Sequence, residues 1–242
     1  MKAQNILVLG GTRDALELAA LLHGQGFSVT TSLAGVTANP ATPMGALRVG
    51  GFGGLDGLIA YARNFDLIAD ATHPFAAKIS AHGHAAAAAL RIPYARLERP
   101  EWVREEGDHW TPVPTIAAAA TVIPAASPVL LTIGRKELAP FLARGDLTGI
   151  IRMIEEPACA IPASFTLLRA KPPFTLESEI ALITNHGIKT LVTKNAGGAH
   201  TSAKITAARQ TATPVIMIAR PEKPAAQTLA TAEEFAALIA AR

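Results

Sequence analysis

The sequence predicts an α/β fold of two Rossmann-like lobes, each with a mainly parallel sheet flanked by helices. Three observations lead to this prediction. Short apolar runs alternate with longer amphipathic stretches along the 242 residues. The runs are rich in Val, Ile and Leu without polar alternation, which is typical of strands buried on both faces of a parallel sheet. A weak internal echo, in which Ile6–Gly10 and Val129–Gly134 each precede a basic residue and a helix, indicates two halves.

The expected strands are the short apolar runs. In order, they are Asn5–Leu9, Ser28–Leu33, Ala46–Val49, Leu67–Asp70, Tyr94–Leu97, Val129–Ile133, Ile150–Ile154, Thr190–Thr193 and Pro214–Ala219. The expected helices are the amphipathic stretches between them. In order, they are Arg13–His23, Leu55–Asn64, Ala76–Leu90, Thr115–Val122, Lys136–Arg144, Leu176–His186, Ser202–Gln210 and Ala232–Ala241. Prolines punctuate Pro112–Ser127, so we expect one domain over residues 1–125 and a second over residues 126–242, with room for a terminal strand to cross between them.

Composition excludes several classes of protein. Half of the residues are hydrophobic and the mean hydropathy is +0.28, which excludes a disordered chain. The net charge of +3 is too balanced for non-specific nucleic-acid binding. No signal peptide is visible, and no stretch approaches the roughly 18 apolar residues of a membrane span. The single cysteine, Cys159, excludes an internal disulfide and a Cys-based metal site. From these observations together, we expect a cytoplasmic protein with no metal, nucleic-acid or membrane partner.

A glycine pair separates the first expected strand from the first helix. Glycine lets the backbone turn tightly and lets a phosphate approach, and the helix N-terminus offers free N–H groups to a pyrophosphate. The full G-x-G-x-x-G pattern is absent, because Thr12 and Ala15 occupy its second and third glycine positions. We expect Gly10, Gly11, Thr12 and Arg13 to contact a dinucleotide; a turn that binds nothing is the alternative.

The end of the second strand indicates which dinucleotide. Proteins that prefer NAD usually carry an acid about 20 residues after the glycines, on the ribose hydroxyls. Here Thr30–Gly35 contains no acid. A carboxylate would repel a 2′-phosphate, whereas the hydroxyls of Thr31 and Ser32 with a nearby cation, Arg13 or Arg48, would accept one. We therefore expect NADPH rather than NADH.

Two further loops follow expected strands. Gly50–Gly54 has four glycines in five residues, and we expect Gly51 and Gly53 to lie against the cofactor; an inert turn is the alternative. Thr72 and His73 follow the next strand, at the carboxyl edge where parallel sheets bind ligands, and we expect both to face the cofactor. The alternative for this second loop is a capping segment with a packed histidine. Asp70 is expected to orient a neighbour or to accept from loop amides.

The loops described so far belong to a series of motifs that continues along the chain. The motifs are Gly10–Thr12, Ser32–Gly35, Arg48–Gly54, Asp70–Ala76, Arg99–Trp102, Ile133–Glu137, Lys194–Gly198, Ala203–Ile205, Ala207–Arg209 and Arg220–Pro221. On these motifs, the chain resembles the precorrin-6A reductase family of cobalamin biosynthesis over nearly its whole length. The resemblance implies reduction by NADPH of one carbon–carbon double bond in a tetrapyrrole-derived macrocycle, giving precorrin-6B. It also implies an NADP-binding first domain and a second domain that contributes substrate-binding residues.

The chain departs from the family pattern at four places. Asp14 stands where the family usually has Glu, and Ala196 replaces a Ser. Val36 stands where the family often has Arg, which weakens the case for a phosphate-binding cation there. Lys171–Phe174 replaces Arg-Gly-Pro-Phe and keeps a basic residue in a stiffer loop.

The implied substrate carries acetate and propionate carboxylates, which need placed cations. His73 is the candidate proton donor, with solvent or a substrate carboxyl as alternatives, and Trp102 is expected to stack on the macrocycle. For each cation the alternative is a solvated surface charge. The candidate cations at family-matching positions are Arg99, Arg135, Lys136, Lys171, Lys194, Lys204, Arg209 and Arg220.

Other functions are weighed against this one. A cobalt-precorrin-6A reductase of the anaerobic pathway and a non-catalytic NADP-sensing protein both stay open. An epimerase or short-chain reductase usually needs Tyr-x-x-x-Lys, but Tyr61 and Tyr94 are followed at that spacing by Phe65 and Glu98. Transfer of the product to the next pathway enzyme is a further expected partnership.

Overall fold

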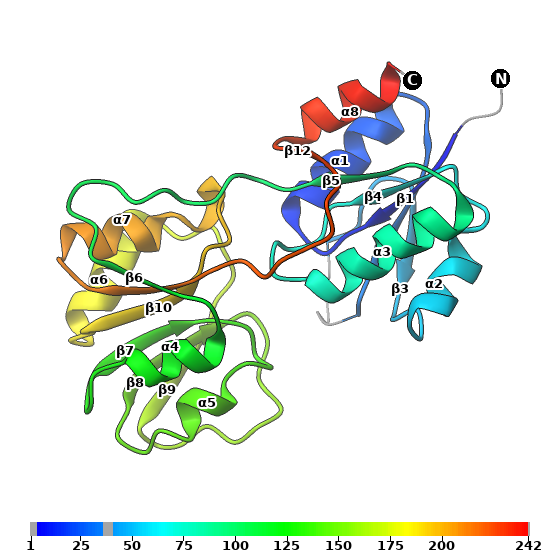
Figure 1. The fold of residues 1–242 in the computed structure, drawn as a ribbon. Coiled ribbons are helices and arrows are strands. Elements are labelled where there is room, and N and C mark those ends of the chain that lie inside the picture. The colour runs from blue at the N-terminus through cyan, green and yellow to red at the C-terminus, as the bar shows by residue number, and fades with distance from the viewer. Residues whose placement is uncertain (1–3, 36–40, 242) are drawn as a thin grey trace. The chain divides into compact units, whose positions relative to one another are not determined.

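The computed structural model describes residues 4–35 and 41–241 (Figure 1), so Val36 lies outside the described residues. The chain divides into two compact units. The first comprises Met1–Pro100 and Pro221–Arg242, and the second comprises Glu101–Arg220. Each unit holds one six-stranded sheet in which all paired strands are parallel. The predicted fold class is therefore confirmed.

The first sheet has the strand order β12-β5-β4-β1-β2-β3. Its strands are β1 Asn5–Leu9, β2 Ser28–Leu33, β3 Ala46–Val49, β4 Leu67–Asp70, β5 Tyr94–Leu97 and β12 Gln227–Leu229. Its helices are α1 Arg13–Gly24, α2 Leu55–Ala62, α3 Ala77–Leu90 and α8 Ala232–Ala240. Helices α1 and α8 cover one face and α2 and α3 cover the other (Figure 1).

Strand β1 is apolar at successive positions because both of its faces are buried under helices. Ile6 and Val8 pack into the cluster under α1 and α8, whereas Leu7 and Leu9 pack into the cluster under α2 and α3. Because successive side chains of a strand point to opposite faces, both faces of the sheet are buried at once.

The second sheet has the strand order β6-β11-β10-β7-β8-β9. Its strands are β6 Trp110–Val113, β7 Pro128–Thr132, β8 Thr148–Met153, β9 Phe165–Arg169, β10 Thr190–Lys194 and β11 Val215–Ile218. Its helices are α4 Ile116–Val122, α5 Ala139–Leu142, α6 Leu176–Asn185, the 3₁₀ turn η1 Ala199–Thr201 and α7 Ala203–Gln210. The helix expected from Lys136 begins only at Ala139.

The chain crosses between the units twice, so the expected division at residues 125 and 126 differs from the observed one (Figure 1). After β5 the chain enters the second unit, where β6 pairs with β11; after β11 it returns, and β12 pairs with β5. The proline-rich stretch thus belongs wholly to the second unit. Pro112 fits there because β6 is an edge strand, where a missing N–H is tolerated.

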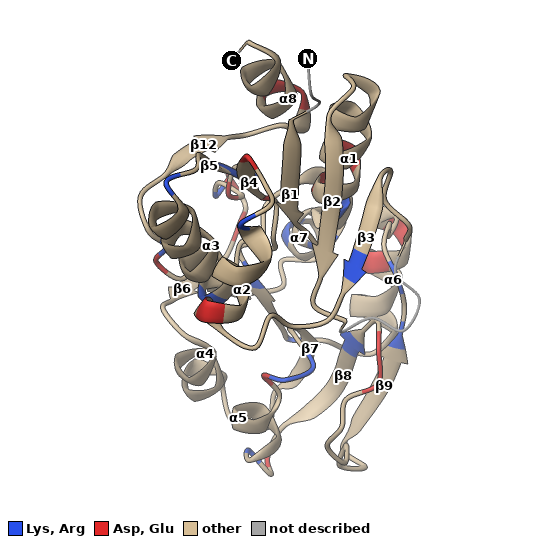
Figure 2. Ribbon diagram, turned by 90° about the vertical axis from the view of Figure 1, so that its right-hand side faces the viewer, with Lys and Arg blue, Asp and Glu red and all other residues tan. Residues whose placement is uncertain are grey.

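Basic and acidic residues are interspersed along the ribbon of both units (Figure 2). Among residues 4–35 and 41–241, no helix combines the length and the apolar character needed to cross a membrane. Within the same described ranges, no group of three or more His, Cys, Asp or Glu side chains is arranged to hold a metal ion.

Candidate functional site

Three loops of the first unit follow the carboxyl ends of parallel strands that belong to one sheet. They lie between β1 and α1, between β3 and α2, and between β4 and α3. Because the strands are parallel, all three loops lie at one edge of the sheet, which is where open α/β sheets bind ligands.

The β1–α1 loop uses its two glycines differently. A Cβ at Gly10 would lie 2.8 Å from Cγ2 of Thr31 on β2, so glycine lets the loop pack closely against that strand. Gly11 has a φ of +112°, and a Cβ on it would meet nothing within 4 Å. The Thr12 hydroxyl accepts from the N–H of Ala15 at 3.0 Å, as a helix N-cap, and donates to the carbonyl of Ala71 at 2.8 Å. Thr12 thus joins the β1–α1 loop to the β4–α3 loop.

Of the two cations expected near Ser32, the structure places Arg48 beside it. Arg48 Nη1 donates to Ser32 Oγ at 3.2 Å, and its guanidinium also donates to the carbonyls of Gly50 and Gly51. The guanidinium carbon lies 3.9 Å from the centroid of the Phe52 ring, a cation–π contact. Arg13 instead is exposed and pairs with Glu17 one helical turn away.

The Gly50–Gly54 loop exposes its backbone. Gly50, Gly53 and Gly54 have φ values of +117°, +76° and +114°, which favour glycine. Gly51 has no such φ, and a Cβ on it would meet nothing within 4 Å. The protein itself therefore gives no reason for glycine at Gly51, whereas a ligand lying against the backbone does.

Gly57, in the first turn of α2, fixes the position of this loop. A Cβ there would lie 1.7 Å from the carbonyl oxygen of Phe52. Gly57→Ala is therefore expected to displace the loop and to lower the free energy of unfolding by about 2–3 kcal/mol. Urea denaturation measures this change. Gly24→Ala is the matched control: its Cβ meets nothing within 4 Å, so stability should stay unchanged or rise slightly. Equal effects of the two substitutions would contradict the interpretation.

The β4–α3 loop begins at a buried carboxylate. Asp70 Oδ1 accepts from the N–H of Thr72 at 3.1 Å and from its hydroxyl at 2.7 Å. The Thr72 side chain is thus turned into the protein and helps to hold the loop. Nδ1 of His73 accepts from the N–H of Phe75 at 3.2 Å, so the neutral ring carries its proton on Nε2.

In the second unit, Glu137 organises the loop after β7. Its Oε2 accepts from the N–H of Gly134 at 2.9 Å and pairs with Lys194 Nζ at 2.5 Å. Lys194 is the last residue of β10, beside β7 in the sheet. The turn between these contacts carries Arg135, half-buried, and Lys136, exposed. The structure therefore brings Arg135, Lys136 and Lys194 to one edge of the second sheet.

The central residue at this edge is Asn195, which sequence reasoning missed as a site residue. Its Oδ1 accepts from the N–H of Trp102 at 2.9 Å, and its Nδ2 donates to the carbonyl of Trp102 at 3.2 Å and to Glu101 Oε2 at 3.1 Å. Asn195 is buried and directly follows a buried strand, which was the available signal.

Three predicted side chains gather around Asn195. Arg220 Nε donates to the carbonyl of Asn195 at 2.9 Å and lies 3.5 Å from Glu101 Oε1. Trp102 Nε1 donates to the carbonyl of Gly198 at 2.9 Å. Lys204 Nζ lies 5.1 Å from the centroid of the Trp102 ring. Because Trp102 also packs on the core of the unit, its ring is held in place from one side.

Three predicted cations lie elsewhere. Arg99 belongs to the first unit, where its Nη1 pairs with Asp14 in the first turn of α1 at 2.7 Å. Arg209 lies in the last turn of α7 and binds Asp108 at 2.9 Å, near the starts of β6 and β11 and thus at the sheet edge opposite the site. Lys171 is exposed after edge strand β9.

A protein family, individual proteins and a solved structure that are similar to this chain all carry the name of a precorrin-6 reductase. The family described as "Precorrin-6x reductase CbiJ/CobK" matches residues 5–240. The chain is 44% identical to "Precorrin-6A reductase" of Rhodococcus erythropolis over 97% of this chain and 96% of that one. It is 31% identical to "Cobalt-precorrin-6A reductase" of Priestia megaterium over 95% of each. The solved structure "CobK precorrin-6A reductase" matches 98% of this chain and 96% of that one, with 39% identity and a TM-score of 0.92.

Proposed function

Because the chain belongs to the precorrin-6x reductase family, we propose that it uses NADPH to reduce one carbon–carbon double bond of precorrin-6A, giving precorrin-6B. The family match over residues 5–240 is the observation that carries this conclusion. The metal-free substrate is favoured because relatives named for it reach 39–44% identity, whereas those named for the cobalt form reach 26–31%.

The three loops of the first unit fit NADPH. The open backbone at Gly11 and Gly51 leaves room for a ligand, and the free N–H groups at the start of α1 suit a pyrophosphate. Arg48 and Ser32 lie together at the ends of β3 and β2, so we assign them the 2′-phosphate. Gly10, Gly53 and Thr12 shape the loops, and Arg13 is a weaker candidate because it pairs with Glu17. NADPH, when bound, supplies the hydride for the reduction.

We assign the carboxylates of the macrocycle to cations of the second unit. Four of them belong to loops or helix starts at the carboxyl edge of that sheet: Arg135, Lys136, Lys204 and Arg220. The fifth, Lys194, is the last residue of β10 at the same edge. Glu137 and Glu101 hold Lys194 and Arg220 in place, which reduces the side-chain entropy that binding must remove. Lys171, in the loop after β9, is a peripheral candidate.

Two predicted cations receive different roles. Arg99 lies beside Asp14 at the start of α1, so we assign it to the coenzyme site of the first unit, where it neutralises a carboxylate close to the pyrophosphate. Arg209 holds Asp108 and Glu105 at the opposite edge, so we propose a structural role for it.

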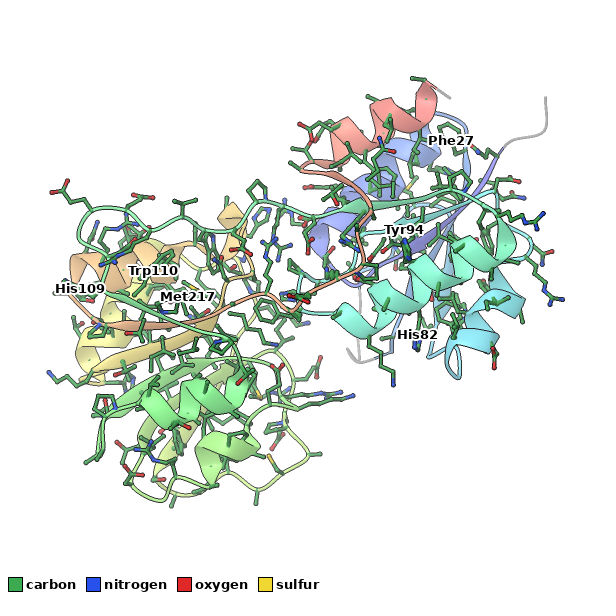
Figure 3. All side chains as sticks on the ribbon, in the orientation of Figure 1. Phe27, His82, Tyr94, His109, Trp110 and Met217 are labelled. Carbon is green, nitrogen blue, oxygen red and sulfur yellow. The ribbon has the colours of Figure 1, made fainter. Side chains whose placement is uncertain are left out.

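His73 fits a contact with the coenzyme better than proton donation. A histidine that acts as an acid must be protonated on both nitrogens, which would break the bond that Nδ1 accepts from Phe75. His73→Ala is therefore expected to retain most of kcat and to raise the KM for NADPH about tenfold. His82→Ala, on α3 (Figure 3), should change neither constant. A hundredfold fall in kcat with an unchanged KM would restore His73 as the proton donor.

The experiment that tests the function follows nicotinamide absorbance while the protein is mixed with precorrin-6A and either NADPH or NADH. The expected result is rapid oxidation of NADPH with loss of the extended conjugation of the macrocycle, and slower oxidation of NADH. If NADPH binds but is consumed only with cobalt-precorrin-6A, the substrate assignment changes. If neither macrocycle is reduced, the chain is an NADP-binding sensor and the proposed enzyme is wrong.

A further inference from the structure

A buried pair of opposite charges lies beneath the β4–α3 loop. Asp70, which ends β4, and Arg96 on β5 are direct cross-strand partners in the sheet. Asp70 is 1% exposed and Arg96 is 6% exposed. Arg96 Nε lies 3.6 Å from Asp70 Oδ2. The neighbouring register pairs of the two strands, Ile68 with Tyr94 and Ala69 with Ala95, carry no charge. Burying two charges costs folding free energy unless they are paired and hydrogen-bonded. A charged pair at this edge of the sheet therefore indicates a specific role.

The Asp70 carboxylate is held on both oxygens. Oδ1 accepts from the N–H and hydroxyl of Thr72, and Oδ2 accepts from the Tyr94 hydroxyl at 2.6 Å. Tyr94 is the first residue of β5 (Figure 3), and its hydroxyl oxygen also lies 3.3 Å from the carbonyl oxygen of Ser80 on α3. Burial alone would raise the pKa of Asp70, but hydrogen bonds from Ser80, Thr72 and Tyr94 keep it below its usual value. Asp70 is therefore a fixed anion that orients the first residues of the loop.

Arg96 connects this anion to a distant part of the chain. Its Nη2 donates to the carbonyl of Pro224 at 3.0 Å. Pro224 lies in the segment that re-enters the first unit between β11 and β12. One residue away, Lys223 pairs with Glu98 at 2.7 Å, so the returning segment is fixed to the end of β5 by two contacts. The guanidinium of Arg96 thus contacts both Asp70, which holds the β4–α3 loop, and Pro224 in the returning segment.

We propose that Arg96 is a positioning residue of the coenzyme site: through Asp70 it holds the loop that carries Thr72 and His73, and it ties this loop to the returning segment at Pro224. The proposal rests on the assignment of NADPH to the first unit. Arg96 itself is buried and acts through Asp70 rather than on the coenzyme. Removing it leaves the Asp70 carboxylate buried without its cation, so the carboxylate must draw in water or shift, and the loop moves with it.

The test compares Arg96→Met with Arg209→Met. Arg209 also pairs with a buried aspartate, Asp108, but in the second unit and at the opposite sheet edge, so it is a matched control for lost stability. We expect Arg96→Met to raise the Kd for NADPH roughly tenfold, measured by nicotinamide fluorescence, and Arg209→Met to leave it unchanged. The rescue variant Arg96→Lys keeps a charge opposite Asp70 and should give an intermediate Kd.

Two further readouts separate positioning from general destabilisation. Asp70→Asn in the Arg96→Met background removes the unpaired charge, while the amide oxygen can still accept from Thr72, so part of the lost NADPH affinity should return. Hydrogen exchange of the free protein should be faster over residues 71–76 and 221–226 in Arg96→Met than in wild type, and unchanged there in Arg209→Met. This exchange measurement needs no coenzyme, so it tests whether Arg96 links the loop to the returning segment even if wild type binds no NADPH. Failure of wild type to bind NADPH would instead refute the proposed function.

Equal Kd values for Arg96→Met and wild type would overturn the proposal, as would an equal loss of affinity in Arg209→Met. Additive effects of Arg96→Met and Asp70→Asn would also overturn it, because they would mean that the two residues act independently. If Arg96→Met does not fold, Arg96→Lys carries the test alone. In that case a Kd and an exchange pattern equal to those of wild type would be the contradicting result.

Discussion

Arg48→Ala is expected to weaken NADPH binding by about tenfold to a hundredfold while it changes NADH binding little. A hydrogen bond to a charged group contributes about 1.5–3 kcal/mol, and each 1.4 kcal/mol is a factor of about ten in affinity. Arg48 is the cation beside Ser32, at a strand end that carries no acid. Only NADPH has a 2′-phosphate, so only NADPH loses a contact when Arg48 is removed. Titration of each variant with both coenzymes measures the effect.

Arg13→Ala is the matched control for this prediction. Arg13 is the first residue of α1, but it is exposed and pairs with Glu17, so its loss should change NADPH binding by less than about twofold. A larger loss in Arg13→Ala than in Arg48→Ala would move the phosphate to Arg13. An equal loss of NADPH and NADH affinity in Arg48→Ala would mean that Arg48 only shapes the loop, through the carbonyls of Gly50 and Gly51.

Asn195→Ala is expected to lower kcat/KM for the macrocycle by about tenfold to a hundredfold, with the Kd for NADPH unchanged. Its amide makes three hydrogen bonds to Glu101 and Trp102, and its loss leaves partly buried backbone groups of Trp102 unpaired, at a cost of about 1–3 kcal/mol. Trp102 and Glu101 then shift, and the cations that they hold, Lys204 and Arg220, shift with them.

Ser127→Ala separates this effect from lost stability. Ser127 is also buried in the second unit, where its hydroxyl lies 3.2 Å from that of Thr190, at the start rather than the end of β10. It should lower the free energy of unfolding modestly and leave kcat/KM unchanged. If Ser127→Ala and Asn195→Ala reduce turnover alike, the cluster around Asn195 has no special part in macrocycle binding.

The central strands could be predicted because burial on both faces leaves a strong local signal. Asn5–Leu9 and Leu67–Asp70 were predicted with the bounds that the structure shows. Three strands were not predicted from the sequence, β6, β9 and β12, which carry polar or proline residues. Two of them, β6 and β12, are the edge strands that follow the two points where the chain passes from one unit to the other. Their pairing joins segments far apart in the chain, β6 with β11 and β12 with β5, so no local pattern could place the division between units.

The candidate site shows the same limit. The loops that follow strands were predicted to lie at the carboxyl edge of their sheet, and they do, because parallel pairing alone puts them there. Arg99 and Arg209 were grouped with the other cations from the family motifs. Their long-range partners, Asp14 and Asp108, place them elsewhere. Arg96 gave no sequence signal, because an arginine inside a short apolar strand shows its role only when Asp70 and Pro224 are seen beside it.

The most direct test of the central claim is a single turnover of precorrin-6A with NADPH deuterated at the nicotinamide C4 position from which hydride leaves. Mass spectrometry of the macrocycle then follows the label. We expect a reduced macrocycle that has gained one deuterium from the coenzyme and one hydrogen from solvent, and reversed labelling when the reaction runs with unlabelled NADPH in deuterated water. A reduced product without coenzyme deuterium, or oxidised NADPH with an unchanged macrocycle, would contradict it.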